Sequence, residues 1–292
     1  MKDKSSLTAY LMTAPALLFL LVFVIAPLFM ALRYSFFNVS FYQDSLFVGP
    51  RNFSIILRTT LFRQSLINAA KFVLIIVPGM MLLSFLLSHT LKTLPPAWAN
   101  FSKTVLYIPG IVSGIAVALI FNFIFHFNAG IINQTLRALG FNRIAFFNSP
   151  VLAVFSVSAV NIWIGLGGNT ILMYAALVNI PKEYYDAASI DGAGALNKMF
   201  FITIPQMKNI FILVCISLTT GTLQMFDLPY MMTGGGPANQ TLTPMLYLYN
   251  NYRDIDKGLG YTIAGALIML VIIASINAVI FRIIRSEKSL EG

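Results

Sequence analysis

The sequence predicts an all-α protein that crosses a membrane several times, and three observations support this fold class. Of its 292 residues, 58% are hydrophobic and only 10% are charged, and its mean hydropathy is +0.81. Soluble proteins average about a quarter charged residues. Six long runs contain no charged residue. These runs are continuously apolar, whereas a membrane β-barrel needs segments of about ten alternating residues, so the spans are expected to be helices.

Composition also excludes several functional classes. The chain has two histidines, His89 and His126, and one cysteine, Cys215. These residues cannot build a zinc site or a disulfide framework. A net charge of +9 would indicate nucleic-acid binding in a soluble chain, but basic residues at the ends of membrane helices account for it here. We therefore expect no metal site, no disulfide and no nucleic-acid partner.

Each uncharged run is long enough to cross the hydrocarbon core of a bilayer. A spanning helix needs about 20 apolar residues, and a charge at the bilayer centre costs about 2.5 to 3.5 kcal/mol. The first run exceeds the roughly 7 to 15 residues of a signal-peptide core, and no clear cleavage site follows it, so we expect an uncleaved helix. We predict one transmembrane domain, 1–292, with six helices at about 7–32, 72–91, 104–125, 150–179, 209–226 and 258–281.

The fourth helix and two connecting segments need separate arguments. The uncharged run that ends before Lys182 is too long for one helix. We begin the helix at Pro150, because proline is tolerated in a first helical turn. The connecting segments 33–71 and 127–149 contain phenylalanine and asparagine, which predicts short interfacial helices there.

The distribution of basic residues gives a weak prediction of orientation. With both termini in the cytoplasm, ten lysines and arginines lie inside and nine lie outside, which is nearly a tie. Five of the nine belong to the single long segment 33–71. Leaving that segment out favours cytoplasmic termini, but charge alone does not decide the orientation.

The segment 181–208 predicts a short amphipathic helix between the fourth and fifth spans. Pro181 suits its first turn, acidic residues complement its N-terminal dipole, and Gly192 ends it. Two alanines give it a low face that another protein can approach, while two tyrosines and an isoleucine offer apolar anchors. The predicted docking surface comprises Glu183, Tyr184, Tyr185, Asp186, Ala187, Ala188, Ile190 and Gly192.

This segment resembles the cytoplasmic loop of the membrane permeases of ATP-binding cassette (ABC) importers. The family pattern is Glu-Ala-Ala, three residues, Gly, nine residues, then Ile-x-Leu-Pro; here it reads Asp186-Ala187-Ala188, Gly192 and Ile202-Thr203-Ile204-Pro205 at the same spacing. Asp186 and Ile204 depart from the pattern but keep its chemical class. The resemblance implies a coupling helix that docks on an ATPase subunit in the cytoplasm. The alternative is an ordinary interfacial helix between two spans.

The resemblance extends over most of the chain and is strongest to the carbohydrate-uptake branch, the maltose and glycerol-3-phosphate type. It implies a type I ABC importer permease fold in a bacterial or archaeal plasma membrane. It also implies a second, unlike permease, two ATPase subunits and an extracytoplasmic solute-binding protein. The stretches that carry it, in order, are Arg51-Asn52-Phe53, Leu106-Tyr107-Ile108-Pro109, Gly130-Ile131-Ile132-Asn133, Asn161-Ile162-Trp163-Ile164-Gly165, Thr233-Gly234-Gly235-Gly236-Pro237 and Gly260-Tyr261-Thr262-Ile263-Ala264-Gly265-Ala266.

The spans contain neutral polar residues but no charge at their centres, and Asp227 stands at the end of the fifth. Proton relays need chains of ionisable groups, and an anionic cargo would need arginine or lysine. Amides and hydroxyls suit a neutral sugar. The resemblance places the substrate pathway at Gly110, Gly114, Asn161, Ile164, Gly165, Gly168, Thr222 and Gln224, with Asn161 the strongest candidate. For the two glycines of Gly110-x-x-x-Gly114, close helix packing is the preferred alternative.

The chain has no ATP-binding loop of the Walker A type, because Gly234-Gly235-Gly236-Pro237 lacks the lysine and the following helix. It also lacks the side-chain pairs of an enzyme site within its spans. We therefore expect no cofactor in this chain, with ATP and Mg²⁺ on the partner ATPase. The predicted function is a permease subunit that translocates a sugar or oligosaccharide by alternating access. The alternative is an ATP-independent carrier or channel for a neutral solute.

Overall fold

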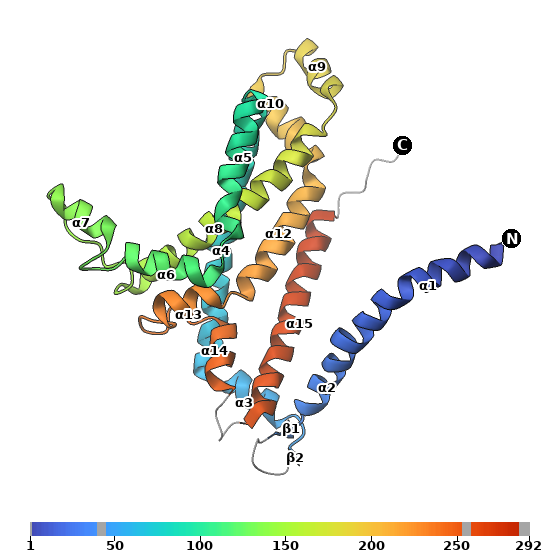
Figure 1. Ribbon diagram of the computed structural model, residues 1–292, viewed down its shortest axis with the longest axis vertical. Helices are drawn as coiled ribbons and strands as arrows, with labels where there is room; N and C mark the ends of the chain where they lie inside the picture. Colours follow the sequence, from blue (N-terminus) through green and yellow to red (C-terminus); the bar gives the residue numbers. More distant parts are fainter. Residues whose placement is uncertain (1, 40–44, 253–257, 286–292) are drawn as a thin grey trace. The chain divides into compact units, whose positions relative to one another are not determined.

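The computed structural model describes residues 2–39, 45–252 and 258–285, and the described chain is almost entirely helical (Figure 1). Its strands are a two-residue antiparallel pair, β1 (Phe37–Asn38) and β2 (Leu46–Phe47), with Phe37 opposite Phe47. The prediction of an all-α fold is confirmed. Among the described residues, four apolar helices are long enough to span a membrane, and the number rises to six when two bent helix pairs are each taken as one span.

The chain forms two compact units. One contains Met1–Phe62 and Leu248–Ile272, and the other contains Arg63–Tyr247 and Ile273–Gly292. The long helix α15 (Gly258–Arg285) contributes residues to both units. The prediction of a single domain over 1–292 stays a prediction.

The first unit consists of an apolar helical run, the strand pair, a short helix and the first part of α15. The run comprises α1 (Lys2–Leu20), the π-helical turn η1 (Leu21–Ile25) and α2 (Ala26–Tyr34). Asn52 in α3 (Arg51–Arg58) is buried and donates to the carbonyl oxygens of Ser35 and Phe37 over 2.9 and 3.0 Å. A Cβ at Gly260 would collide with the Phe37 carbonyl. Asn52 therefore bonds α3 to the segment that follows α2, and Gly260 lets α15 approach the same segment closely.

The second unit holds the remaining helices. The connecting segments 33–71 and 127–149 each contain a short helix, as the sequence predicts: α3 in the first unit and α7 in the second. The elements are α4 (Thr60–Thr93), α5 (Pro96–Ile111), α6 (Gly114–Ile124), α7 (Ile131–Ala138), α8 (Pro150–Val178), α9 (Lys182–Ile190), α10 (Ala195–Lys198), η2 (Met199–Thr203), α11 (Ile204–Gln206), α12 (Lys208–Leu223), α13 (Asp227–Thr233) and α14 (Pro244–Asn251), of which α4 and α14 begin or end in the first unit.

Two breaks interrupt the apolar helices of this unit. The chain bends by 94° between α5 and α6, where Val112 and Ser113 adopt extended backbone, and by 68° between α11 and α12. Pro109 contributes to the first break because it has no N–H to donate. The run expected to span 104–125 therefore holds two helices, and the run expected at 209–226 leaves helical geometry at Gln224. Discontinuous helices of this kind line central sites in many transporters.

Apolar packing in the second unit is concentrated in two clusters. One lies where α4, α6, α8 and α13 meet and includes Phe72, Val117, Val157 and Leu228. We call the other the α9 cluster, because Tyr185 of α9 packs against it; its buried residues are Phe85, Met173, Leu177, Ile180, Met207 and Val214. The first cluster includes residues of α6, which follows the α5–α6 break. The α9 cluster contains Met207 at the α11–α12 break and packs against the segment that follows α8.

Candidate functional site

The helix α9 forms where the sequence predicts it. Pro181 precedes the helix in extended backbone, and Glu183 lies in the first turn. The helix ends at Ile190, and Gly192 takes a left-handed conformation with φ of +76°. There the Ala193 N–H donates to the carbonyl of Ala188 over 2.8 Å. A residue with positive φ next to a helix end closes the last turn, and glycine adopts this backbone without strain.

One face of α9 is exposed, and one tyrosine faces inward. Tyr184 is 48% exposed and Ile190 is 88% exposed. Tyr185 is half-buried, and its hydroxyl lies 2.9 Å from the hydroxyl of Thr203 in η2. Tyr185 packs against the α9 cluster. Of the predicted anchors, only Tyr184 and Ile190 are therefore free to contact another protein. The other predicted docking residues are exposed or half-buried, namely Glu183, Asp186, Ala187, Ala188 and Gly192.

Two lysines that sequence reasoning missed connect α9 to neighbouring helices. The Lys92 ammonium at the end of α4 lies 4.8 Å from the ring centroid of Tyr185, within reach of a cation–π interaction. Lys198 in α10 donates to the hydroxyl of Ser189 over 2.6 Å. Charge at helix ends was visible in the sequence, but nothing there specified these partners.

The predicted pathway residues of α5, α6 and α8 meet at the first helix break. A Cβ placed on Gly110 would lie 3.3 Å from the carbonyl oxygen of Ile164 in α8. A Cβ on Gly114 would lie 3.3 Å from a carboxylate oxygen of Asp227. Both glycines thus allow close approach of another segment, which fits the packing alternative. Gly110 and Ile164, two of the predicted pathway residues, lie close together.

Asn161 lies beside the segment that follows α12. Its amide nitrogen is 3.5 Å from the sulfur of Met225, a weak partner that leaves the amide able to bind a stronger acceptor. By contrast, the Asn122 amide donates to the carbonyl oxygens of Met231 and Met232 and ties α6 to α13. The role of Asn161 as a ligand contact stays a prediction.

The other pathway residues fall into different surroundings. Gly165 faces α4, because its Cβ would press on Met80. Thr222 is buried, whereas Gly168 and Gln224 are exposed. Sequence reasoning missed Gly167, where a Cβ would collide with the Leu106 carbonyl. This glycine makes the close contact of α5 with α8, which run side by side (Figure 1).

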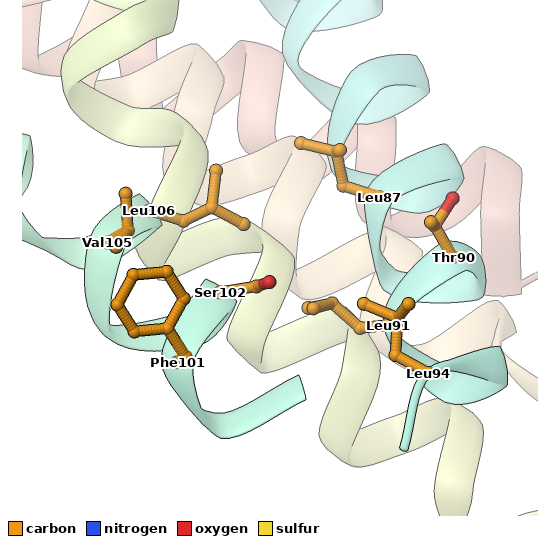
Figure 2. Close-up of a pocket in the computed structure, with 8 residues that line it drawn as sticks. All are labelled: Leu87, Thr90, Leu91, Leu94, Phe101, Ser102, Val105 and Leu106. Carbon is orange, nitrogen blue, oxygen red and sulfur yellow. The ribbon is translucent and has the colours of Figure 1, made fainter. Parts of the chain in front are cut away.

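A separate pocket of about 290 Å³ lies between the end of α4 and the start of α5 (Figure 2). Leucine, valine and phenylalanine make up most of its lining, with the hydroxyls of Thr90 and Ser102. Thr90 donates to the carbonyl of Leu86 in its own helix over 3.0 Å. A sugar needs several convergent donors and acceptors. The pocket therefore suits an apolar group and not a sugar.

The helical fold with broken spans and an exposed connecting helix defines a membrane permease. A family model of the binding-protein-dependent transport system inner membrane component matches residues 80–288. The chain belongs to this family, and it is an ABC importer permease of the inner membrane and not an enzyme. The sequence resemblance is thereby confirmed.

Relatives match along almost the whole chain. The chain is 34% identical to the sulfoquinovosyl glycerol transport system permease protein SmoG of Agrobacterium fabrum, and the match covers 96% of this chain and 91% of the relative. It is 30% identical to the trehalose/maltose transport system permease protein MalF of Thermococcus litoralis, covering 93% and 92%. Among solved structures, a bacterial ABC transporter that imports the acidic polysaccharide alginate has a chain with a TM-score of 0.84, at 19% identity and covering 99% and 98%. That match shows the same fold.

Proposed function

We propose that this chain forms half of the translocation pathway of an ATP-driven sugar importer. Its relatives are named for the transport of lactose, trehalose/maltose and arabinooligosaccharides, among others. In the proposed assembly, it pairs with a second, unlike permease, and two ATPase subunits bind ATP and Mg²⁺ in the cytoplasm. A solute-binding protein delivers the sugar from outside; one solved relative is in complex with a periplasmic protein that holds an alginate pentasaccharide.

The observation that carries this proposal is the geometry of α9. Tyr184 and Ile190 are exposed, while Tyr185 is half-buried and its hydroxyl forms a hydrogen bond with the hydroxyl of Thr203. A force applied to the exposed residues of α9 is therefore transmitted to η2 and to the packed α9 cluster. Well-packed interiors move as units and do not deform continuously. Closure of the ATPase pair would thus rotate the helices that surround Asn161.

Alternating access follows from this arrangement. With ATP bound, the two permeases open the pathway to the outside, and hydrolysis resets them toward the cytoplasm. The docking of α9 on an ATPase requires the 181–208 segment to be cytoplasmic, so both termini are proposed to be cytoplasmic as well. Amide and hydroxyl groups at Asn161, Thr222 and Gln224 are proposed to line the sugar's route.

The test is to purify the tagged chain gently from its native membrane and to identify the copurifying proteins. We expect a second six-span permease and an ATPase. The variant Ile190→Ser should lose the ATPase, because it removes an 88% exposed apolar residue from the proposed docking face. Leu139→Ser, at the end of α7, is a matched control with 67% exposure and should keep it.

Recovery of the chain without an ATPase, with sugar uptake intact, would instead support an ATP-independent carrier. Equal ATPase recovery from both variants would contradict the role of α9 while leaving the importer itself in place.

A further inference from the structure

One carboxylate of the second unit stands apart from the coupling segment. Among residues whose side chains the structure describes, the acidic ones are Glu183, Asp186, Asp191 and Asp227. The first three belong to α9 and its C-terminal end, and Asp227 begins α13 directly after the fifth helix. Figure 1 shows α13 beside α6 and far from α9 within this unit.

Asp227 lies where the pathway residues converge. One of its carboxylate oxygens lies 3.3 Å from the position of a Cβ on Gly114, at the N-terminus of α6. It follows Met225, which contacts Asn161, by two residues. Its side chain is exposed, as is that of Gln224 three residues earlier. The carboxylate therefore lies next to one predicted pathway residue, Gly114, and two residues along the chain from Met225, the partner of another, Asn161.

The carboxylate has no ion pair in the described part of the chain, so its charge is not cancelled by a basic side chain. The partial positive charge at the N-terminus of the eleven-residue helix α6 interacts favourably with it. Ionisable residues at membrane depth are costly and usually functional. A fixed, uncompensated negative charge in a confined pathway also acts on every solute that passes, because low-dielectric walls focus its field.

We propose that Asp227 selects the cargo by charge: the pathway admits neutral and cationic sugars, such as amino sugars, and repels anionic ones, such as uronates and sugar phosphates. This inference rests on the proposed sugar pathway and assigns its specificity.

The test measures the local potential with thiol reagents, which removes the substrate preference of the solute-binding protein from the readout. In a complete transporter whose other subunits are made free of cysteine, Cys215→Ser removes the single cysteine of this chain, and Gln224→Cys provides the reporter. Its reaction rate is measured with a cationic trimethylammonium-ethyl and an anionic sulfonatoethyl methanethiosulfonate. The ratio of the two rates reports the charge that the reagents meet at this position.

We expect Asp227→Asn to lower the cation-to-anion rate ratio roughly tenfold, the effect of removing one unit charge a few ångströms away. A reporter at Ile190→Cys on α9 should show no change. An equal ratio at position 224 with and without the Asp227 charge would overturn the proposal, and so would a reporter that neither reagent modifies.

A second variant covers failure of Asp227→Asn to assemble. Asp227→Ser also removes the charge but leaves a smaller polar side chain, and Asp227→Glu is its control, because it keeps the charge. A lowered ratio in Asp227→Ser with an unchanged ratio in Asp227→Glu supports the proposal, and an unchanged ratio in Asp227→Ser overturns it. Sugar uptake that persists without ATPases would refute the proposed importer mechanism but would leave this rate ratio as a valid measurement.

Discussion

The hydroxyl of Tyr185 lies 2.9 Å from the hydroxyl of Thr203, and this contact joins α9 to the π-helical turn η2. The Thr203 hydroxyl also lies within hydrogen-bond distance of the Lys198 carbonyl, at 3.3 Å. Thr203 is buried, so the tyrosine hydroxyl replaces water as its partner. A buried hydroxyl that loses its partner is destabilising. Together with the Lys198–Ser189 hydrogen bond, this pair is thus a direct polar link between the proposed docking helix and the segment that leads into α12.

Tyr185→Phe should weaken this link without removing the ring from the α9 cluster. We expect a loss of about 0.5 to 1.5 kcal/mol in stability and fewer sugar molecules transported per ATP hydrolysed, because α9 is held less firmly. The measurement is the coupling ratio in proteoliposomes that contain the complete transporter.

Tyr184→Phe is the matched control for that experiment. Its ring is 48% exposed, and its hydroxyl has no hydrogen bond among the residues that the structure describes. We expect its coupling ratio to equal that of the unmodified protein. Equal losses in the two variants would show that the Tyr185–Thr203 bond plays no special part in coupling.

The coupling segment illustrates how far sequence reasoning reached. Pro181, the acidic first turn and Gly192 are local signals, and the helix begins and ends where they predict. The inward orientation of Tyr185 was not predictable in this way, because both tyrosines are equally apolar in sequence. Their difference depends on Thr203, which meets Tyr185 only after the chain turns back.

Gly192→Ala should destabilise the end of α9, because φ of +76° is unfavourable for a residue with a Cβ. We expect a cost of about 1 to 2 kcal/mol and reduced recovery of the ATPase in purification from the membrane. Gly194→Ala, with φ of −72° and open space around its Cβ, should behave like the unmodified protein. A normal ATPase yield from Gly192→Ala would argue against a fixed geometry of this turn.

Gly167→Ala should be poorly tolerated, because its Cβ would collide with the Leu106 backbone in α5. Backbone cannot move aside as a flexible side chain can, so we expect destabilisation of about 1 to 3 kcal/mol or more. The neighbouring Gly168→Ala should be nearly neutral, since its Cβ would meet Tyr107 at an ordinary 3.9 Å. Thermal unfolding of the purified complexes in detergent compares the two, and similar midpoints would contradict the α5–α8 packing.

The helix breaks show where sequence reasoning stopped. Uncharged runs identify apolar length, and they located the third and fifth spans, but charge carries no information on bending. The 94° turn at Val112 and Ser113 depends on which segments can approach the glycines at either side. Asp227 was seen at the end of the fifth span, yet its position beside Gly114 required the fold. The meeting of Gly110 with Ile164 followed from family resemblance and not from composition.

Asn161→Ala should lower sugar uptake while leaving the complex assembled, because among the described residues its amide nitrogen donates to the weak acceptor Met225 sulfur. Loss of one ligand hydrogen bond should weaken transport by about two- to tenfold, equivalent to roughly 0.5 to 1.5 kcal/mol. Asn122→Ala provides the contrast, since it strands the carbonyl oxygens of Met231 and Met232. That variant should lower the unfolding temperature first. If Asn161→Ala instead loses stability and Asn122→Ala only uptake, the assignment of ligand contact and structural contact at this break must be reversed.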